Sequence, residues 1–272
     1  MATSFVPLHV HSHYSLLKAL PKIGDLVDKA KEEGVEALAL TDLGNLYCAI
    51  EFYKACKDAG IKPIIGLESV MEGGRHILLY AKNIQGYKNL LQIVTKSHLN
   101  SPGNPTVTSQ MLEEHGEWLI QLDPKDTDVP MREVYYIHGE DRRAWETLRA
   151  IENRGPVDSG NIDEEEDSFA FPTQTEMEER FGKEALRKTL DIAAQCDLDL
   201  GLGTWYFPDI DIPAGQTYDQ ELRRLVEEGI KRRFIGETEE IRKRIEYEYE
   251  IITKKGYSPY FLVVADLLNF AR

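Results

Sequence analysis

The first hundred residues alternate short apolar segments with amphipathic ones, and this alternation most constrains what the chain can fold into. Residues 37–40 and 76–81 are nearly continuous runs of apolar side chains, as is typical of strands that are buried on both faces. Residues 21–33 instead repeat apolar side chains at spacings of three and four before Gly34, which predicts an amphipathic helix. The pattern predicts an α/β fold whose parallel sheet is covered on both faces, as a barrel or as a doubly wound sheet.

The same periodicities predict the other elements of the chain. Predicted strands cover residues 5–10, 37–40, 63–66, 76–81, 118–122 and 133–137. Predicted helices cover residues 21–33, 47–59, 86–97, 141–153, 183–195, 218–234 and 239–255, and an apolar helix follows residues 256–259. The stretch DPKDTDVP between the last two strands is too short for a crossover helix of about a dozen residues. One strand–helix unit is therefore predicted to be missing there.

The charge of the chain argues against extensive contact with nucleic acids. The formal net charge is −15 at pH 7, and nearly all of the acidic excess lies in residues 101–200. Nucleic-acid affinity depends on basic groups that displace the counterions of phosphates, so we do not expect the chain to bind DNA over its whole surface. Residues 157–168 are glycine-containing and acidic, which predicts a solvated loop.

The sequence also indicates a location and the state of the cysteines. It contains no run of about 18 apolar residues, and its N-terminus lacks the basic start and apolar stretch of a secretory signal. These features predict a cytoplasmic protein without a membrane partner. Three cysteines without a C-x-x-C spacing argue against a disulfide framework and a zinc ribbon, and predict reduced, mostly buried thiols.

Residues able to bind a metal lie at the ends of the first three predicted strands and at the start of the fourth. His9, His11 and His13 can share one face because alternate side chains of a strand do so, and the imidazoles of His9 and His11 suit one divalent cation. An H-x-H pair taken alone also fits a histidine cluster on the rim of the surface. Asp42 follows the second strand. An aspartate at this position is either an active-site carboxylate or the N-cap of the next helix. Glu68 follows the third strand and His76 begins the next, so the set predicts a metal site at one sheet edge.

These residues and their surroundings resemble the PHP domain of bacterial family C replicative polymerases, the DNA polymerase III alpha subunits. The resemblance rests on FVPLHVHSHYSLL, on LALTDLGNLYCAIEFYKACKDAGIKPIIGLE and on HILLYAKNIQGYKNLLQIVTKSHL, in that order. WYFPDIDIPAGQTYDQELRRLVEEGIKRRF and RIEYEYEIITKKGYSPYFLVVADLLNFAR resemble the connection from the PHP domain to the palm. The resemblance implies a distorted (β/α) barrel, contracted here, with a metal cluster that supports phosphoester hydrolysis, including 3′→5′ exonuclease activity, in active members.

The family's ligands are only partly present. His9, His11, Glu68 and His76 stand at ligand positions that the resemblance implies. The other positions hold different residues, and we interpret them as lost: Lys18 for an aspartate, Leu43 for the histidine of T-D-H-G, and Glu133 and Tyr135 for a late Asp-x-His pair. The expected Gly-Cys segment is also absent at residues 121–124.

The losses predict a site that is unable to assemble several cations. Lys18 would insert a positive charge where an anion belongs, and Leu43 cannot coordinate. His9, His11, Glu68 and His76 would still suffice for a single zinc or other divalent cation, since three or four N/O ligands hold zinc. We name no catalytic residue.

The resemblance divides the chain into a PHP-like domain over residues 1–200 and a linker with helices over residues 201–272. Asp209 and Asp211 superficially resemble the aspartate pair of a polymerase palm, but they precede IPAG and the next helix, as the family's linker does. We therefore predict a surface turn there. Because the sequence contains neither the palm's Gly-Arg-Gly-Ser-type loop nor its catalytic aspartates, we do not expect this chain alone to polymerise DNA.

Three functions remain open from the sequence. The first is a mainly structural PHP domain of a DNA polymerase III alpha-like replicase, which supports the palm and contacts the rest of the polymerase or other replisome subunits, and DNA through them. The second is a metal-dependent phosphoesterase or 3′→5′ exonuclease that uses His9, His11, Glu68 and His76. The third is a stand-alone protein that binds a replisome component.

Overall fold

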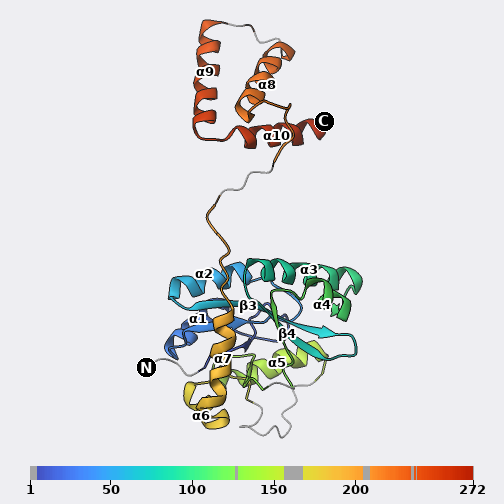
Figure 1. The fold of residues 1–272 in the computed structure, drawn as a ribbon, viewed down its shortest axis with the longest axis vertical. Coiled ribbons are helices and arrows are strands. Elements are labelled where there is room, and N and C mark those ends of the chain that lie inside the picture. The colour runs from blue at the N-terminus through green and yellow to red at the C-terminus, as the bar shows by residue number, and fades with distance from the viewer. Residues whose placement is uncertain are drawn as a thin grey trace. The chain divides into compact units, whose positions relative to one another are not determined.

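The computed structural model describes residues 5–125, 128–155, 168–204, 209–233, 236 and 238–271. The chain forms two compact units, Met1–Leu200 and Gly201–Arg272, and Figure 1 labels their helices and two of their strands, β3 and β4. Most of the predicted acidic loop, residues 157–167, lies outside the described residues.

The first unit contains a five-stranded mixed sheet and a separate two-stranded parallel sheet. Its strands are β1 (His9–Val10), β2 (Ala37–Leu40), β3 (Lys62–Met71), β4 (His76–Ala81), β5 (Thr106–Val107), β6 (Leu119–Leu122) and β7 (Glu133–Val134). Strands β2, β3, β4 and β6 pair in that order, β5 pairs with the end of β3, and β1 pairs with β7. The β1–β7, β2–β3 and β3–β5 pairs are parallel, whereas β3–β4 and β4–β6 are antiparallel.

The two antiparallel pairs correct the prediction of a parallel sheet. Residues 72–75 alone join β3 to β4, and Gly73 and Gly74 among them have φ values of 90° and 83°. Such a short connection cannot hold a crossover helix, so it folds β4 back on β3 as a hairpin. The α/β class is confirmed, but among the described residues no strand pairing joins β6 to β7, and barrel closure is not shown.

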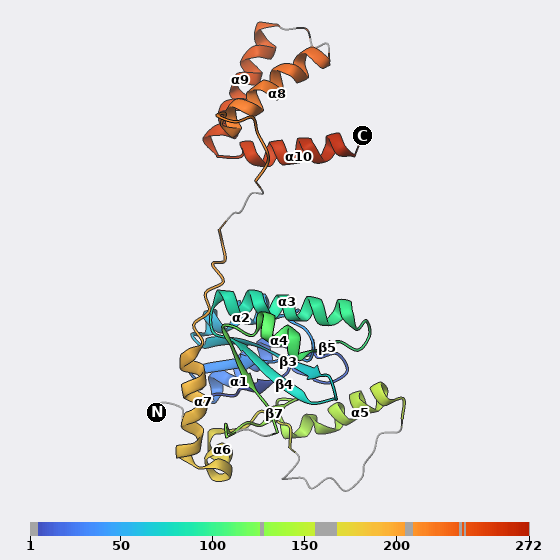
Figure 2. The ribbon, with the colours of Figure 1, turned by 45° about the vertical axis from the view of Figure 1, so that its right-hand side comes forward.

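Alternate side chains of the strands build two cores on opposite faces of the sheet. On β2, Leu38 and Leu40 belong to one buried cluster, and Ala37 and Ala39 to the other, because successive strand residues point to opposite faces. Side chains of α1 (Ile23–Glu32), α2 (Ala49–Ala59) and α3 (Ile84–Asn100) join the first cluster, and those of α7 (Lys183–Gln195) contribute to the second. Figure 2 shows α2 and α3 lying along the sheet. Both faces are covered, as predicted.

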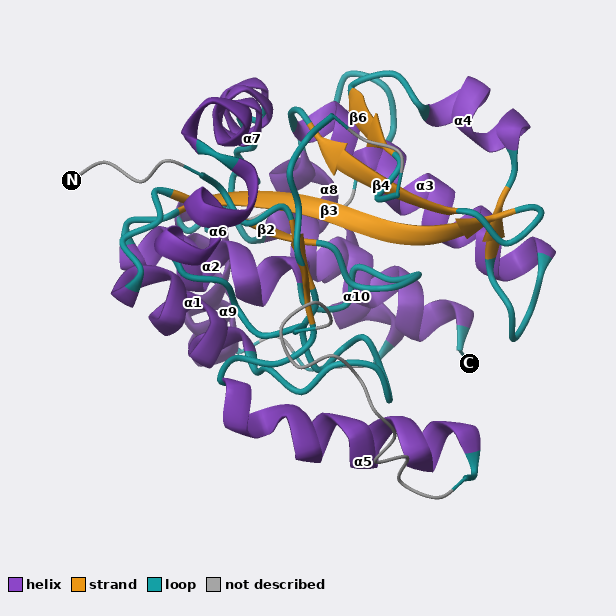
Figure 3. Cartoon of the chain, turned by 90° about the horizontal axis from the view of Figure 1, so that it is seen from below, coloured by secondary structure: helices purple, strands orange, loops and turns teal. Residues whose placement is uncertain are grey.

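The remaining elements of the first unit are helical, and strands β3 and β6 differ from the predicted bounds. They are α4 (Ser109–His115), the short 3₁₀ helix η1 (Gly139–Asp141), α5 (Arg142–Asn153) and α6 (Gln174–Phe181). The described residues between β6 and β7 form no helix. Strand β3, the long strand in Figure 3, extends to Met71 through its pairing with β4, so Glu68 lies inside a strand. Strand β6 begins after Trp118, whose φ of 63° lies outside the β region.

The second unit consists of α8 (Tyr218–Arg232), α9 (Glu239–Lys254) and α10 (Ser258–Phe270). Thr217 and Gln220 form a capping box at the start of α8. Helix α10 packs on α8 but buries only Ser258 and Leu262. Its other large apolar side chains are exposed within this unit, namely Tyr260, Phe261, Leu267, Leu268 and Phe270. Among the described residues, no helix is long and apolar enough to span a membrane.

Candidate metal centre

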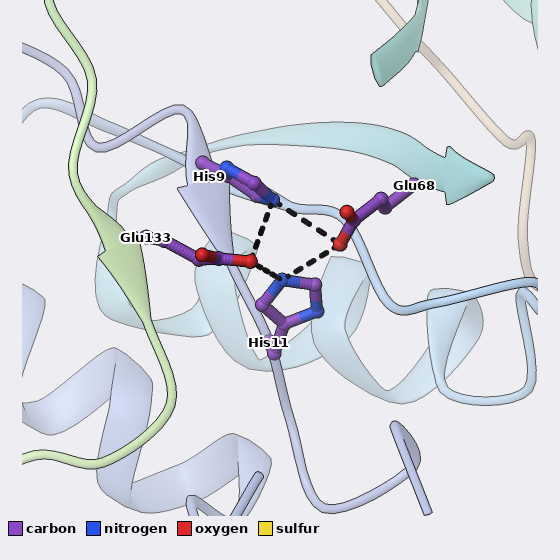
Figure 4. Close-up of side chains that lie close together, drawn as sticks. All are labelled: His9, His11, Glu68 and Glu133. Carbon is purple, nitrogen blue, oxygen red and sulfur yellow. Dashed lines mark hydrogen bonds and ion pairs between the residues drawn. The ribbon is translucent and has the colours of Figure 1, made fainter. Parts of the chain in front are cut away.

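Four side chains face one another at the end of β1, as Figure 4 shows. One ligand atom from each lies within 4.8 Å of the ligand atoms of the other three. Three of the side chains are buried, and the fourth is partly exposed. We call this group the ligand cluster, and its members are His9, His11, Glu68 and Glu133.

Strand pairing brings the ligand cluster together from distant parts of the chain. The parallel register of β1 and β7 sets His9 beside Glu133, and the backbone N–H of His11 donates to Val134 O at 3.1 Å. Glu68 comes from β3, whose backbone at this residue bridges to Leu43 just after β2. The cluster therefore depends on three strands that are fixed by backbone hydrogen bonds.

The distances within the ligand cluster suit one small cation. The Nε2 atoms of His9 and His11 lie 3.2 and 3.1 Å from Glu68 Oε2, and 3.7 and 3.8 Å from Glu133 Oε1. A tetrahedral zinc ion with bonds of about 2.0–2.1 Å has ligand atoms about 3.3 Å apart. In the described part of the chain, the buried His11 Nε2 forms no hydrogen bond of good geometry. Since leaving such an atom without a partner is costly, the residues present fit one divalent cation.

The charges of the ligand cluster stabilise one another. Burial alone would raise the pKa of the Glu68 carboxyl, but the close contacts of this carboxylate with His11, His76 and His9 hold that pKa well below its usual range. Burial also opposes a charged His11, yet Glu133 and Glu68 outweigh it and raise the pKa of His11 to about 9. A proton on His11 thus balances the two carboxylates, and a cation would compete with that proton for Nε2.

His76 lies beside the ligand cluster without belonging to it. Its Nδ1 contacts Glu68 Oε1, the oxygen that does not face His9 and His11. The hydrogen bond to Glu68 raises the pKa of His76. Of the four remaining ligands expected from the sequence, the structure therefore brings His9, His11 and Glu68 together and leaves His76 outside the group. Their metal-binding role stays a prediction.

Glu133 is the member of the ligand cluster that sequence reasoning missed. The resemblance places it at a lost ligand position, whereas the structure places its carboxylate with His9, His11 and Glu68. The available signal was chemical, because a glutamate in place of an aspartate still offers a carboxylate oxygen. The pKa of Glu133 is lowered because its contact with His11 and the charge of His9 outweigh its burial.

Lys18, Leu43 and Tyr135 lie outside the ligand cluster. The ammonium of Lys18 pairs with Glu152 Oε1 on α5 at 2.6 Å, so its charge is already balanced, contrary to the expectation that it enters the site uncompensated. Tyr135 stacks on His11 with ring centroids 4.7 Å apart and donates a hydrogen bond to Glu133 Oε1. Tyr135 therefore does not replace the family's ligand but contacts two candidate ligands, His11 and Glu133.

The other candidate residues point elsewhere. Asp42 is buried and accepts hydrogen bonds from Ser12, Ser15 and Cys48. His13 Nδ1 lies 3.3 Å from Pro21 O. Asp209 and Asp211 are exposed in the non-helical connection before α8, as predicted for a surface turn.

Comparisons with known proteins identify the family of the chain. The family described as "PHP domain" matches residues 7–155, and the family described as "Bacterial DNA polymerase III alpha NTPase domain" matches residues 220–272. The chain therefore belongs to the PHP domain family. More particularly, it is the PHP domain of a DNA polymerase III alpha-like protein, together with the residues that match the second family.

Individual relatives span the whole of this chain. DNA polymerase III subunit alpha of Halalkalibacterium halodurans is 33% identical over 98% of this chain and 30% of its own length. The same subunit of Aquifex aeolicus is 29% identical over 100% of this chain and 32% of its own length. The chain thus spans about a third of the length of these relatives. Among solved structures, Endonuclease Q in complex with a duplex that has an abasic lesion is 20% identical over 43% of this chain and 33% of that one. Its TM-score of 0.30 is too low to establish a shared fold.

Proposed function

We propose that this chain is a structural module of a DNA polymerase III alpha-like replicase, which holds one divalent cation and does not hydrolyse phosphoesters. The convergence of the ligand cluster within 4.8 Å carries the proposal. Its two carboxylates and two imidazoles match the oxygen and nitrogen ligands of zinc. Two carboxylates also balance the charge of a divalent ion.

The surroundings of the ligand cluster support a single ion. Hydrolysis by two metals requires a second ion about 3.5–4 Å from the first, and therefore further ligands beside the ligand cluster. The described residues contain no second group of three such ligands, and Lys18, Leu43 and Tyr135 supply none at the remaining family positions. When bound, one cation would neutralise the buried carboxylates and link β1, β3 and β7. This role strengthens the contracted barrel that we propose for the first unit.

The exposed apolar side chains of α10 support a partner for the second unit. Phe270 and Leu267 are 90% and 64% exposed, and residues 220–272 match a family region found in longer polymerase subunits. We propose that the rest of the polymerase covers α10. Because this chain is acidic, the remaining part of the polymerase or another replisome subunit would supply the basic surface that contacts DNA. We propose that this assembly works in the cytoplasm.

Metal analysis and a nuclease assay test the proposal together. The purified chain is loaded with Zn²⁺, dialysed and analysed for bound metal, and is then incubated with a 3′-labelled primer–template and Mg²⁺, Mn²⁺ or Zn²⁺. We expect about one zinc per chain, by analogy with mononuclear sites, and an intact primer. The His9→Ala/His11→Ala variant should lose the zinc, whereas His13→Ala, which changes a histidine outside the cluster, should keep it.

Two results would contradict the proposal. A chain without zinc under these conditions would refute the metal site. Removal of the terminal nucleotide that disappears in His9→Ala/His11→Ala but persists in His13→Ala would instead establish the phosphoesterase or exonuclease function.

A further inference from the structure

Asp42 is a buried carboxylate that the proposed metal site does not use. Its side chain is surrounded by donors, because it accepts hydrogen bonds from Ser12 N and Ser12 Oγ, both at 2.7 Å, from Ser15 Oγ at 2.6 Å and from Cys48 Sγ at 2.9 Å. Four donors satisfy an ionised carboxylate, which only accepts hydrogen bonds. One of these donors, Ser15, connects Asp42 to the ligand cluster.

Ser15 contacts three groups at once. Its Oγ donates to Asp42 Oδ1, receives the backbone N–H of Leu43 at 3.0 Å, and lies 3.1 Å from His11 Nδ1. A hydroxyl has one proton to donate and two lone pairs to accept with. Because its proton is committed to Asp42, Ser15 Oγ can only accept from His11. The nitrogen Nδ1 of His11 must therefore carry a proton.

A proton on Nδ1 determines what the other side of the His11 ring offers. In a neutral imidazole only one nitrogen is protonated, so a neutral His11 with its proton on Nδ1 directs the lone pair of Nε2 toward Glu68 and Glu133. A lone pair aimed at two carboxylate oxygens is repelled unless a cation or a proton lies between them. The unpartnered Nε2 of His11 is the atom that such a cation would bind.

We propose that Asp42 acts through Ser15 as a positioning residue for His11, holding the imidazole proton on Nδ1 and leaving Nε2 free to bind the cation. The inference rests on the metal site proposed above. It gives Asp42 a role in metal binding even though the neighbouring Leu43 cannot act as a ligand. Leu43 contributes through its backbone N–H, which donates a hydrogen bond to Ser15 and helps to hold it in place.

Ser12 provides a matched control for Ser15. Both serines are buried and donate to Asp42, but among the described contacts only Ser15 reaches His11. Zn²⁺ affinity is measured for the full chain by competition with a chelating dye. We expect Ser15→Ala to weaken zinc binding roughly 10–100-fold, as the loss of a partner that orients a metal ligand does. Ser12→Ala should bind zinc like the unaltered chain, and Ser15→Thr, which keeps a hydroxyl, should restore most of the affinity.

NMR on the metal-free chain supplies a readout that does not require zinc. With ¹⁵N-labelled histidine, the shifts of the two His11 ring nitrogens are recorded between pH 7 and pH 10. We expect Nδ1 to stay protonated throughout, and Ser15→Ala to let the proton distribute over both nitrogens at the upper end of the range. Ser12→Ala should leave the distribution unchanged.

The possible failures are distinguishable. Equal zinc affinities in Ser15→Ala and Ser12→Ala, or a neutral His11 with its proton on Nε2, would overturn the inference. If no form of the chain binds zinc, the metal site itself is refuted. The NMR measurement then still decides the position of the His11 proton, with Nδ1 supporting the Asp42–Ser15–His11 contact and Nε2 overturning it.

Discussion

Single residues decide how many ligands the site retains. An aspartate-to-glutamate change keeps a carboxylate in the ligand cluster at Glu133, whereas Tyr135, two residues later, only supports its neighbours. The sequence identifies which side chains could coordinate. It cannot show that the longer Glu133 side chain still reaches His9 and His11, because that depends on the register of β1 and β7.

Glu133→Gln tests this residue directly. The amide keeps the shape of the side chain but loses the negative charge that balances a cation, so zinc affinity should fall roughly tenfold or more, as for other changes at metal sites. Glu152→Gln is the control, since Glu152 is similarly exposed and pairs with Lys18 outside the cluster. Zinc titration of both variants checks the expectation, and equal affinities would exclude Glu133 as a ligand.

The thiols give a second prediction at this scale. All three cysteines are buried and unpaired, as predicted from the sequence. Burial raises the pKa of Cys56 to about 12 and of Cys196 to about 11, and burial with the charge of Asp42 raises the pKa of Cys48 far above its usual range. The thiols stay protonated, and thus unreactive, at pH 8. Iodoacetamide should leave the folded chain unmodified and add three groups after denaturation, as read by mass spectrometry; rapid labelling of the folded chain would refute this.

At the scale of elements, apolar periodicity predicts β2, β4 and α7 with the bounds that the structure has. Periodicity does not predict the bounds of strands whose length depends on pairing with neighbouring strands. Strand β3 is predicted to end at Gly66 but continues through it, because β4 pairs along its second half. Strand β5 has only two residues, too few for any periodicity. The antiparallel direction of β4 depends on the turn at Gly73 and Gly74. The alternation of strands and helices predicts a parallel strand there instead.

Gly66 lies where elements press closely on the backbone. A Cβ atom there would lie 2.8 Å from Thr41 Cγ2 and 3.0 Å from both Leu79 O and Tyr80 Cδ1. Gly66→Ala should therefore lower the free energy of unfolding by about 1–3 kcal/mol, as overpacking does. Gly24→Ala in α1 has no atom within 4 Å of the added Cβ and should leave stability unchanged or raise it by up to about 1 kcal/mol. Urea denaturation compares the two, and a Gly66→Ala chain as stable as Gly24→Ala would contradict the packing described.

At the scale of the whole molecule, the resemblance predicts the family, and the apolar character of residues 260–270 predicts a helix in need of a partner. The arrangement of the strands in the first unit cannot be predicted from any single segment of the sequence. It arises from pairings such as that of β1 with β7, whose residues are far apart in the sequence. The sequence also overstates the effect of Lys18, since only the fold shows that α5 delivers Glu152 to its ammonium.

The exposed face of α10 gives the prediction at this scale. Phe270→Glu should change the stability of the isolated chain by less than about 0.5 kcal/mol, since surface changes rarely do more. It should nevertheless weaken binding to the rest of the polymerase, measured by co-purification of the separately expressed parts. Leu262→Glu is the contrasting variant, because Leu262 is 2% exposed and a charge there should unfold α10, as seen by circular dichroism. Undiminished binding by Phe270→Glu would show that the partner contacts another surface.

The origin of the ligands in β1, β3 and β7 has a consequence for the order of events during synthesis. Among the described strands, β7 is the last to leave the ribosome, and Glu133 is carried on it. A nascent chain that ends before this strand presents at most three of the four donors, so tight capture of a cation waits for translation to pass residue 133. Metal uptake would then mark the moment at which the first and last strands of the unit meet.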